Sequence, residues 1–227
     1  MEERAQLVGR RTSTDVVYEY LHQEIVTLNL RPGAKISETE IAGRFGISRQ
    51  PVRDAFARLA NEDLLLVQPQ KATEVRRFSE RKISKARFVR MAVEVEVLRN
   101  AALAWDGNAD QAIRENLTLQ ERAAADGNAA EFHAHDKTFH DMLCEAANAP
   151  LAGEAINENR APVDRLCVLS LVNREELANL LQDHRDIFGR LQANDPDGVE
   201  TSIRNHLGRL DKTIANIRAV HEGYFDT

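Results

Sequence analysis

The chain has 227 residues, of which 43% are apolar and 29% are charged, and it carries a formal net charge of −6. This composition excludes disordered, collagen-like and low-complexity proteins, and the length allows one large or two modest domains. No apolar run approaches the roughly 18 residues of a membrane-spanning helix, and the N-terminus lacks the apolar stretch of a secretory signal. We therefore expect a cytoplasmic protein without a membrane segment, in which Cys144 and Cys167 are reduced packing residues.

The charge is distributed unevenly. The first 78 residues hold 12 lysines and arginines against 11 acidic residues, a net charge of +1, whereas the remainder holds 18 against 25, a net charge of −7. The strand signal of the first part also ends near residue 78, and long amphipathic helices follow it. We therefore predict two domains, over residues 1–78 and 79–227.

The predicted elements begin with a helix over roughly residues 13–28, because apolar residues recur there on one helical face. A turn at Arg31-Pro-Gly33 ends it. The sequence Ser37-Glu-Thr-Glu40 fits a capping box that starts a short second helix, and Gly46 allows the tight turn that follows. Ser48 is the expected N-cap of a third helix.

The third helix has two distinct faces. Its apolar residues follow the i, i+3, i+4, i+7 spacing of a buried face: Val52, Ala55, Phe56 and Leu59. Arg49, Gln50 and Arg53 are left on the outward side. Residues 64–78 then read as two short strands around a Pro-Gln-Lys-Ala turn.

Three helices followed by a hairpin are typical of a winged helix-turn-helix, whose third helix enters the major groove of DNA. The segment from Ser48 to Ala60 holds three arginines and one aspartate. Arginine can bind guanine or phosphate, and the helix end at Ser48 can donate N–H groups to a phosphate. Lys71 at the hairpin tip could contact the minor groove or a phosphate. The alternative is a small helical domain with solvated arginines, and Arg58 has an ordinary helix-surface partner in Asp54.

Residues 30–59, LRPGAKISETEIAGRFGISRQPVRDAFARL, resemble the winged-helix domain of GntR-type bacterial transcription regulators. The elements that carry the resemblance are Leu-x-Pro-Gly, Glu-x-x-x-Ala and Ser-Arg-x-Pro-Val-Arg-Asp-Ala. The resemblance implies contacts to double-stranded operator DNA from Arg44, Ser48, Arg49 and Arg53, with the wing around Lys71 in the minor groove. Such wings usually have a glycine where this chain has Ala72, and a left-handed backbone there would cost alanine about 1 kcal/mol.

The second part predicts an all-α antiparallel bundle, so the protein as a whole is mainly α. Turn signals delimit about six helices joined by short loops. These signals fall at residues 106–108, 126–128, 148–150, Val172–Asn173 and 194–198.

Polar residues of metal-ligand type interrupt three apolar helix stripes of this bundle. Asp136 and His140 are spaced i, i+4 on one face, and His184 and His206 each lie in an otherwise apolar stripe. A buried carboxylate needs a partner, which a divalent ion bound by these four residues would supply. Such coordination suits Zn, Ni, Mn or Fe and leaves positions open. The alternative is separate hydrogen-bonded core histidines, and the neighbouring His133 and His135 are expected at the surface.

Three segments of the bundle resemble the all-helical FCD-type, ligand-binding domain of FadR-like regulators, especially its VanR-like members. They are RFVRMAVEVEVLRNAA, FHAHDKTFHDMLCEAANAPL and LQDHRDIFGRLQANDPDGVETSIRNHL. The resemblance implies the same four metal ligands, an effector that is a small carboxylate or sugar acid, and Arg90 lining the cavity. Arginine also matches a carboxylate bidentately, although Arg90 could equally be a helix-edge arginine that reaches solvent. Arg165 is a second candidate.

These features predict an effector-responsive transcription factor, not an enzyme. A homodimer would place two recognition helices about one turn of DNA apart, and a bound acid would shift the two DNA heads. We expect the bound effector to relieve repression. Two alternatives remain open: a metalloenzyme fused to a DNA-binding head, with Asp141 and Glu145 as the candidate bases, and a metal that only stabilises the bundle.

Overall fold

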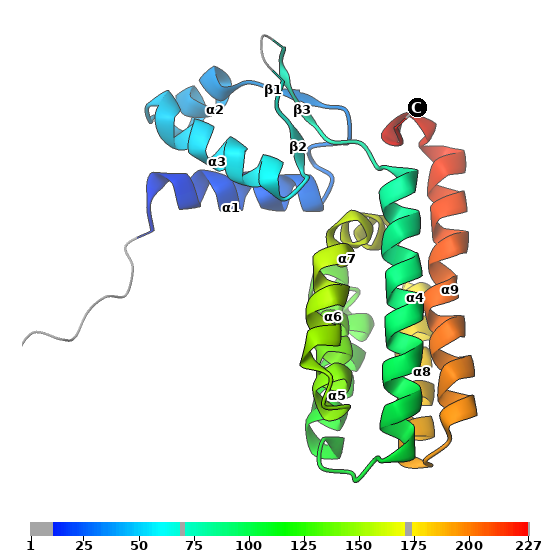
Figure 1. The fold of residues 1–227 in the computed structure, drawn as a ribbon. Coiled ribbons are helices and arrows are strands. Elements are labelled where there is room, and N and C mark those ends of the chain that lie inside the picture. The colour runs from blue at the N-terminus through cyan, green and yellow to red at the C-terminus, as the bar shows by residue number, and fades with distance from the viewer. Residues whose placement is uncertain (1–10, 69–70, 171–173, 227) are drawn as a thin grey trace, which may run out of the picture. The chain divides into compact units, whose positions relative to one another are not determined.

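The computed structural model describes residues 11–68, 71–170 and 174–226, except for the side chains of residues 160–162, 164–165 and 167–170. Arg165, Cys167 and the predicted break at Val172–Asn173 therefore lie outside the described residues. The chain divides into two compact units, residues 1–77 and 78–227 (Figure 1). In the part that the structure describes, no helix is both long enough and apolar enough to cross a membrane.

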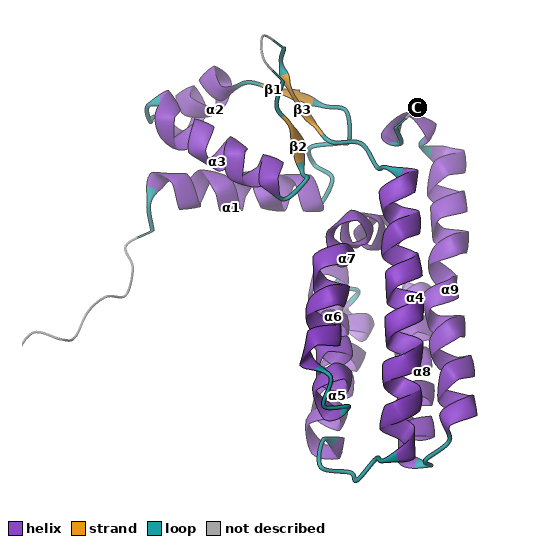
Figure 2. Ribbon diagram, viewed as in Figure 1, coloured by secondary structure: helices purple, strands orange, loops and turns teal. Residues whose placement is uncertain are grey.

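In the first unit, the residues that the structure describes form three helices and a small sheet (Figure 2). Its elements are α1 (Ser13–Val26), β1 (Lys35–Ile36), α2 (Glu38–Phe45), α3 (Arg49–Asn61), β2 (Leu65–Leu66) and β3 (Thr73–Val75). The apolar face of α3 packs on α1, and the buried side chains of both helices form the core of this unit. The predicted helices and the two strands of the hairpin are confirmed.

The start of α2 differs from the prediction. Ser37 is the N-cap residue, but its side chain makes no capping hydrogen bond, so the predicted capping box is wrong. Ser37 directly follows β1 in an extended conformation, and its hydroxyl does not reach the amides of the first turn. A capping box occurs instead at α1, where Thr12 and Asp15 satisfy each other's backbone N–H groups.

The sheet has three antiparallel strands in the order β1-β3-β2. Strand β1 was not predicted, because two residues are too short to show alternation; it pairs Ile36 with Thr73 of β3. Among the described non-glycine residues, positive φ angles occur only at Leu28, Asp63, Asn148 and Asn194, so Ala72 does not adopt a left-handed conformation. The wing therefore forms without the glycine that the resemblance led us to expect.

The described residues of the second unit form a bundle of six long helices, as predicted (Figures 1 and 2). They are α4 (Glu80–Leu103), α5 (Asp110–Asp126), α6 (Ala129–Ala146), α7 (Pro150–Ser170), α8 (Arg174–Gln192) and α9 (Pro196–Val220). Helix α4 packs against α7 and α9, α5 packs against α6 and α8, and α8 packs against α9. Cys144 is buried in this bundle, and burial raises the pKa of its thiol to about 12.

The first residue of the second unit, Phe78, is hydrogen-bonded to the segment that follows α9. A 3-10 turn, η1 (Glu222–Tyr224), follows α9 and brings the chain end to Phe78. The Phe78 N–H donates to the Tyr224 carbonyl oxygen, and the Asp226 N–H donates to the Phe78 carbonyl oxygen, both at 2.8 Å. The rings of Phe78 and Phe225 lie 5.5 Å apart and both are buried. The C-terminus thus fixes the first residue of the bundle.

Candidate nucleic-acid interface and metal centre

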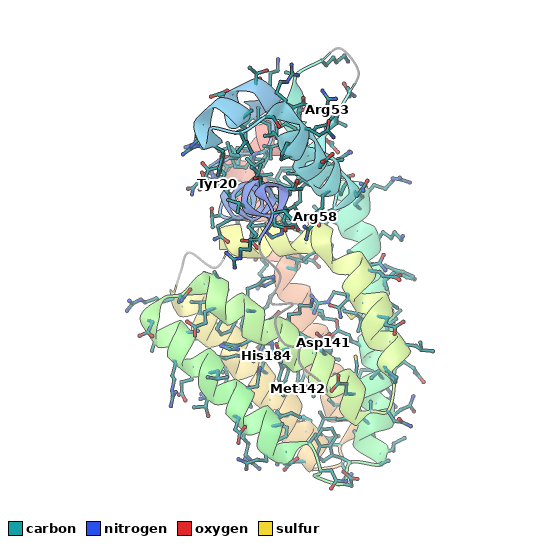
Figure 3. All side chains as sticks on the ribbon, turned by 90° about the vertical axis from the view of Figure 1, so that its left-hand side faces the viewer. Tyr20, Arg53, Arg58, Asp141, Met142 and His184 are labelled. Atoms are coloured by element: carbon teal, nitrogen blue, oxygen red, sulfur yellow. The ribbon has the colours of Figure 1, made fainter. Side chains whose placement is uncertain are left out.

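All residues predicted to contact DNA are exposed: Arg44, Ser48, Arg49, Gln50, Arg53 and Lys71. The apolar residues of α3 are buried against the rest of the first unit, so the opposite face of α3 remains open to solvent. Figure 3 labels Arg53 and Arg58 on this helix. Ser48 is the N-cap of α3 and its side chain makes no capping hydrogen bond.

One carboxylate of α2 holds two arginines of α3. Glu38 Oε2 accepts from Nη2 of Arg49 at 3.1 Å and from Nη2 of Arg53 at 3.4 Å. Partial burial favours the neutral acid, but these two charge-assisted hydrogen bonds outweigh it and lower the pKa of Glu38. The guanidinium groups of Arg49 and Arg53 are therefore held next to each other while more than half of each side chain stays exposed.

The remaining polar groups of this face have local partners. The Arg44 guanidinium lies 4.8 Å from the centre of the Tyr20 ring, and Gln50 Nε2 donates to Asp54 Oδ1 at 2.8 Å. Arg58 does not pair with Asp54 as expected. It lies 3.6 Å over the Tyr18 ring and donates to Asp15, because α1 packs beside this end of α3. These contacts of Arg58 are therefore with α1 within the first unit.

The second unit brings together the four predicted metal ligands from α6, α8 and α9. One potential ligand atom from each of Asp136, His140, His184 and His206 lies within 4.8 Å of the others. Nε2 of His140 lies 3.2 Å from Nε2 of His206, and Nε2 of His184 lies 3.4 Å from Oδ1 of Asp136. The three histidines are buried, and His184 lies inside the bundle (Figure 3).

The other ring nitrogen of each histidine faces an oxygen atom. Nδ1 of His140 lies 2.7 Å from Glu94 Oε2, Nδ1 of His184 lies 2.6 Å from Gln120 Oε1, and Nδ1 of His206 lies 3.6 Å from Asp183 Oδ2. The contact between His184 and Gln120 is a hydrogen bond, and an amide oxygen that accepts at Nδ1 stabilises the tautomer with its proton there, which leaves the Nε2 lone pair of His184 free. Nδ1 of His140 and Nδ1 of His206 lie near carboxylate oxygens but are buried without a hydrogen-bond partner among the described residues.

These residues fit a divalent cation. Two ligand atoms held about 2.1 Å from one ion at the tetrahedral angle lie roughly 3.4 Å apart, close to the separations between His140 and His206 and between His184 and Asp136. The remaining separations are longer, up to 4.8 Å. Nε2 of His184 is likewise buried without a hydrogen-bond partner among the described residues. Nε2 of His140 and Nε2 of His206 face each other, and a shared cation would bind the lone pairs of both nitrogens when each ring carries its proton on Nδ1.

The electrostatics keep the imidazoles in the form that binds metals. Burial lowers the pKa of His184 to about 3, and burial also lowers the pKa of His140 although Glu94 opposes that shift. Burial raises the pKa of Asp183, but the neighbouring His206 and the hydrogen bonds from Arg209 outweigh it and lower the pKa to about 2. Burial therefore favours the neutral imidazoles of His140 and His184, and the carboxylate of Asp183 stays ionised at neutral pH.

Several residues of this centre were not predicted. Glu94, Gln120 and Asp183 are buried polar residues that contact the three histidines. Gln120 interrupts the apolar stripe of α5, which is a signal that the sequence offered. His133 is not at the surface as expected but partly buried in a cavity wall, because α6 turns this side chain toward α8 and α9.

Arg90 does not reach out from a helix edge. It is 8% exposed, its Nε donates to Glu94 Oε1 at 2.7 Å, and its Nη2 lies 3.4 Å from His140 Nε2. Arg90, Asp136 and His206 form part of the wall of a 340 Å³ cavity between α4, α6, α8 and α9. The candidate bases lie elsewhere: Asp141 accepts from Asn157 at 2.9 Å, and Glu145 is exposed.

The winged helix-turn-helix and the helical bundle together define a class, the DNA-binding transcription regulators. The chain belongs to the bacterial regulatory proteins of the gntR family, whose model matches residues 13–75, and the FCD domain matches residues 86–209. The HTH-type transcriptional repressor RspR of Escherichia coli is 33% identical over 92% of both chains. These families and relatives are transcription regulators and not enzymes, which excludes the metalloenzyme alternative.

Two further comparisons agree. A probable D-xylose utilization operon transcriptional repressor of Paenarthrobacter nicotinovorans is 29% identical over 91% of both chains. A solved structure of a GntR transcriptional regulator from Rhodococcus shares the fold with a TM-score of 0.70, at 20% identity over 89% of this chain and 97% of that one. The predicted fold class and family are confirmed.

Proposed function

We propose that this regulator is a repressor that binds operator DNA as a homodimer and responds to a small carboxylic acid at a metal site in its helical bundle. The names of two relatives support repression, and one of them links it to the use of a small metabolite. The four ligands are Asp136, His140, His184 and His206. Operator contacts come from Arg44, Ser48, Arg49, Gln50 and Arg53 and from the wing around Lys71.

The observation that carries the proposal is the matched orientation of three histidines. Each has an oxygen atom facing Nδ1 and directs Nε2 toward the same small volume, into which Asp136 also projects. Separate core histidines would not need a common orientation. A zinc, nickel, manganese or iron ion is the partner that this donor set accepts.

The metal site and Arg90 would each bind one oxygen of the carboxylate. A divalent ion, when bound, supplies an electrophilic centre for a carboxylate oxygen. Glu94 fixes the Arg90 guanidinium at the cavity wall, where its N–H groups can donate to the second oxygen. The surrounding helices exclude bulk water from this end of the cavity, which strengthens both interactions.

Control of DNA binding requires a difference in affinity between two conformations. An acid that binds equally to both would leave the operator affinity unchanged. In a homodimer the separation of the two α3 helices sets the fit to successive major grooves, so a small change in each bundle can lower operator affinity. The reciprocal effect follows by linkage, and operator DNA should weaken acid binding by the same factor.

The first experiment measures metal content and its consequences. Purified protein and the His184→Ala variant are analysed for metal by mass spectrometry and for operator binding by mobility shift, using a duplex selected from random sequence. We expect wild-type protein to carry about one divalent ion per chain and His184→Ala to lose it. His135→Ala on α6 is the matched control and should keep the metal.

Two results would overturn parts of the proposal. Equal metal content in wild-type and His184→Ala protein would exclude the assigned site. If His184→Ala loses thermal stability but still releases operator DNA when an acid is added at lower temperature, the metal only stabilises the bundle. Sedimentation that shows a monomer on the operator would exclude the homodimer.

A further inference from the structure

The cavity beside the metal cluster has one polar end and a largely apolar wall. Arg90, Asp136 and His206 form the polar end. The rest of the wall has six polar or charged residues and six apolar ones, and most of the cavity surface is apolar. The apolar side chains come from α4, α6, α8 and α9: Phe88, Met91, Phe132, Leu180, Leu207 and Leu210. A ligand that reaches the cluster must therefore place the remainder of its body against hydrocarbon.

The arginines of the wall already have carboxylate partners. Arg87 pairs with Asp211, Arg90 pairs with Glu94, and the Arg209 guanidinium donates to both carboxylate oxygens of Asp183. These pairs leave no uncompensated arginine for a second acidic group of a ligand. A divalent ion next to Asp136 and three neutral imidazoles leaves one net positive charge, which a single carboxylate neutralises.

The wall offers few partners to a hydroxylated body. Ser84 and Thr213 are the only neutral hydroxyl residues among the described lining residues. Arg87 and Arg209 are paired with carboxylates, and the other polar residues of the wall are His133 and the exposed Glu176. Hydroxyl groups that lose water without gaining a partner weaken binding, whereas an apolar body gains affinity from the same wall. The volume of 340 Å³ is near the lower end of the roughly 300–1,000 Å³ range of small-molecule pockets, which limits the body to a compact group.

We propose that the effector is a monocarboxylic acid with a compact apolar body, aromatic or branched aliphatic, and not a sugar acid. This inference rests on the proposed function and narrows its ligand class. The carboxylate lies at the end of the cavity formed by Arg90, Asp136 and His206, and the apolar body contacts Met91, Leu180 and the other hydrocarbon side chains.

Calorimetry on full-length, zinc-loaded protein tests this with three acids that share one carboxylate: acetate, benzoate and gluconate. Acetate reports the carboxylate alone, benzoate adds an apolar body and gluconate adds a hydroxylated one. We expect benzoate to bind at least about tenfold more tightly than either of the others. The order of the three affinities for wild-type protein tests the inference without any variant.

A substitution in the wall adds a second readout. Leu180→Asn should weaken benzoate binding by about tenfold and leave acetate binding unchanged, because only benzoate reaches that side chain. Leu119→Asn on α5, away from the cavity, is the matched control. Gluconate binding more tightly than benzoate would overturn the inference and leave the proposed metal site intact. Failure of all three acids to bind zinc-loaded protein would overturn the proposed carboxylate response itself.

Discussion

Gln120 Oε1 lies 2.6 Å from Nδ1 of His184 in the interior of the bundle. The glutamine is itself oriented, because its Nε2 donates to Asn116 Oδ1 at 2.7 Å and Asn116 Nδ2 donates to the His135 carbonyl oxygen at 3.1 Å. This chain of amides directs an acceptor at His184 and keeps the proton on Nδ1. Nε2 is left bare on the side of Asp136, which is the state that a metal ligand requires.

Replacement of Gln120 by leucine should therefore weaken metal binding without removing a ligand. We expect the metal affinity of Gln120→Leu to fall by about 10–100-fold, since His184 loses the partner that fixes its tautomer and ring orientation. Competition with a chromogenic chelator measures the change. Gln111→Leu, an exposed glutamine on the same helix, is the control, and an unchanged affinity in Gln120→Leu would contradict the proposed role.

The recognition surface can be tested at Arg49 and Arg53. Loss of an arginine that contacts a base should cost about 1–3 kcal/mol of operator binding, whereas loss of one that contacts a phosphate should weaken binding to all sequences and reduce its salt dependence. The double variant Arg49→Ala, Arg53→Ala should lose specific mobility shift of a selected operator. Arg58→Ala should retain it because Arg58 is held by Tyr18 and Asp15. Specific binding by the double variant would disprove α3 as the reading helix.

Glu38 should affect specificity more than affinity. Its carboxylate aligns Arg49 and Arg53 and also repels phosphates, so Glu38→Gln should raise binding to random duplex and lower the ratio of specific to non-specific affinity. Titrations of both duplexes at two salt concentrations measure this ratio. Glu40→Gln, on the same short helix, removes an equal charge and is the control; an unchanged ratio in Glu38→Gln would argue against the alignment.

Glu38 should also make the stability of the folded protein depend on pH. Because the pKa of Glu38 is lowered by folding, its contribution is present above the unfolded-state pKa and is lost as the pH falls through the folded-state value. The arginine partners are largely exposed, so Glu38→Gln should cost less than about 1 kcal/mol at pH 7. In urea unfolding, the difference in unfolding free energy between wild type and Glu38→Gln should disappear in strong acid. A difference that grows as the pH falls would contradict the prediction.

Removal of Arg90 should destabilise the bundle. Glu94 is buried, and although burial raises its pKa, Arg90 and His140 together outweigh that effect and hold the pKa well below its usual range. Arg90→Ala deprives this buried carboxylate of its guanidinium partner and should cost about 3–5 kcal/mol of unfolding free energy, whereas Arg90→Leu with Glu94→Leu should recover much of the loss. Arg114→Ala, at an exposed pair with Asp110, is the control in denaturant unfolding. A similar small loss in both arginine variants would contradict the pairing.

The C-terminal contact is expected to stabilise the second unit. Phe225 is 4% exposed and packs on Phe78, so Phe225→Ala should lower the free energy of unfolding by about 3–5 kcal/mol. Val220→Ala removes a side chain that is 74% exposed and should change little. Thermal unfolding of both variants compares them, and equal melting temperatures would show that the chain end does not hold the bundle.

Local sequence patterns determined the helices and the exposed arginines. Apolar spacing alone placed the buried face of α3, and the same spacing revealed His184 and His206 as polar interruptions of buried stripes. Such patterns are readable because a helix repeats every 3.6 residues whatever it packs against. The start of α2 and the two-residue strand β1 are harder to predict from sequence, because a helix cap or a short strand pairing depends on only one or two contacts.

Only the tertiary structure decided which polar groups meet. Glu94, Gln120 and Asp183 lie on α4, α5 and α8, and nothing in their spacing along the chain indicates that each faces a histidine. The pairing of Glu38 with Arg49 and Arg53 likewise depends on how α2 packs on α3. Periodicity fixes the face of a helix on which a side chain lies, but the partner on that face is set by packing between helices distant in sequence.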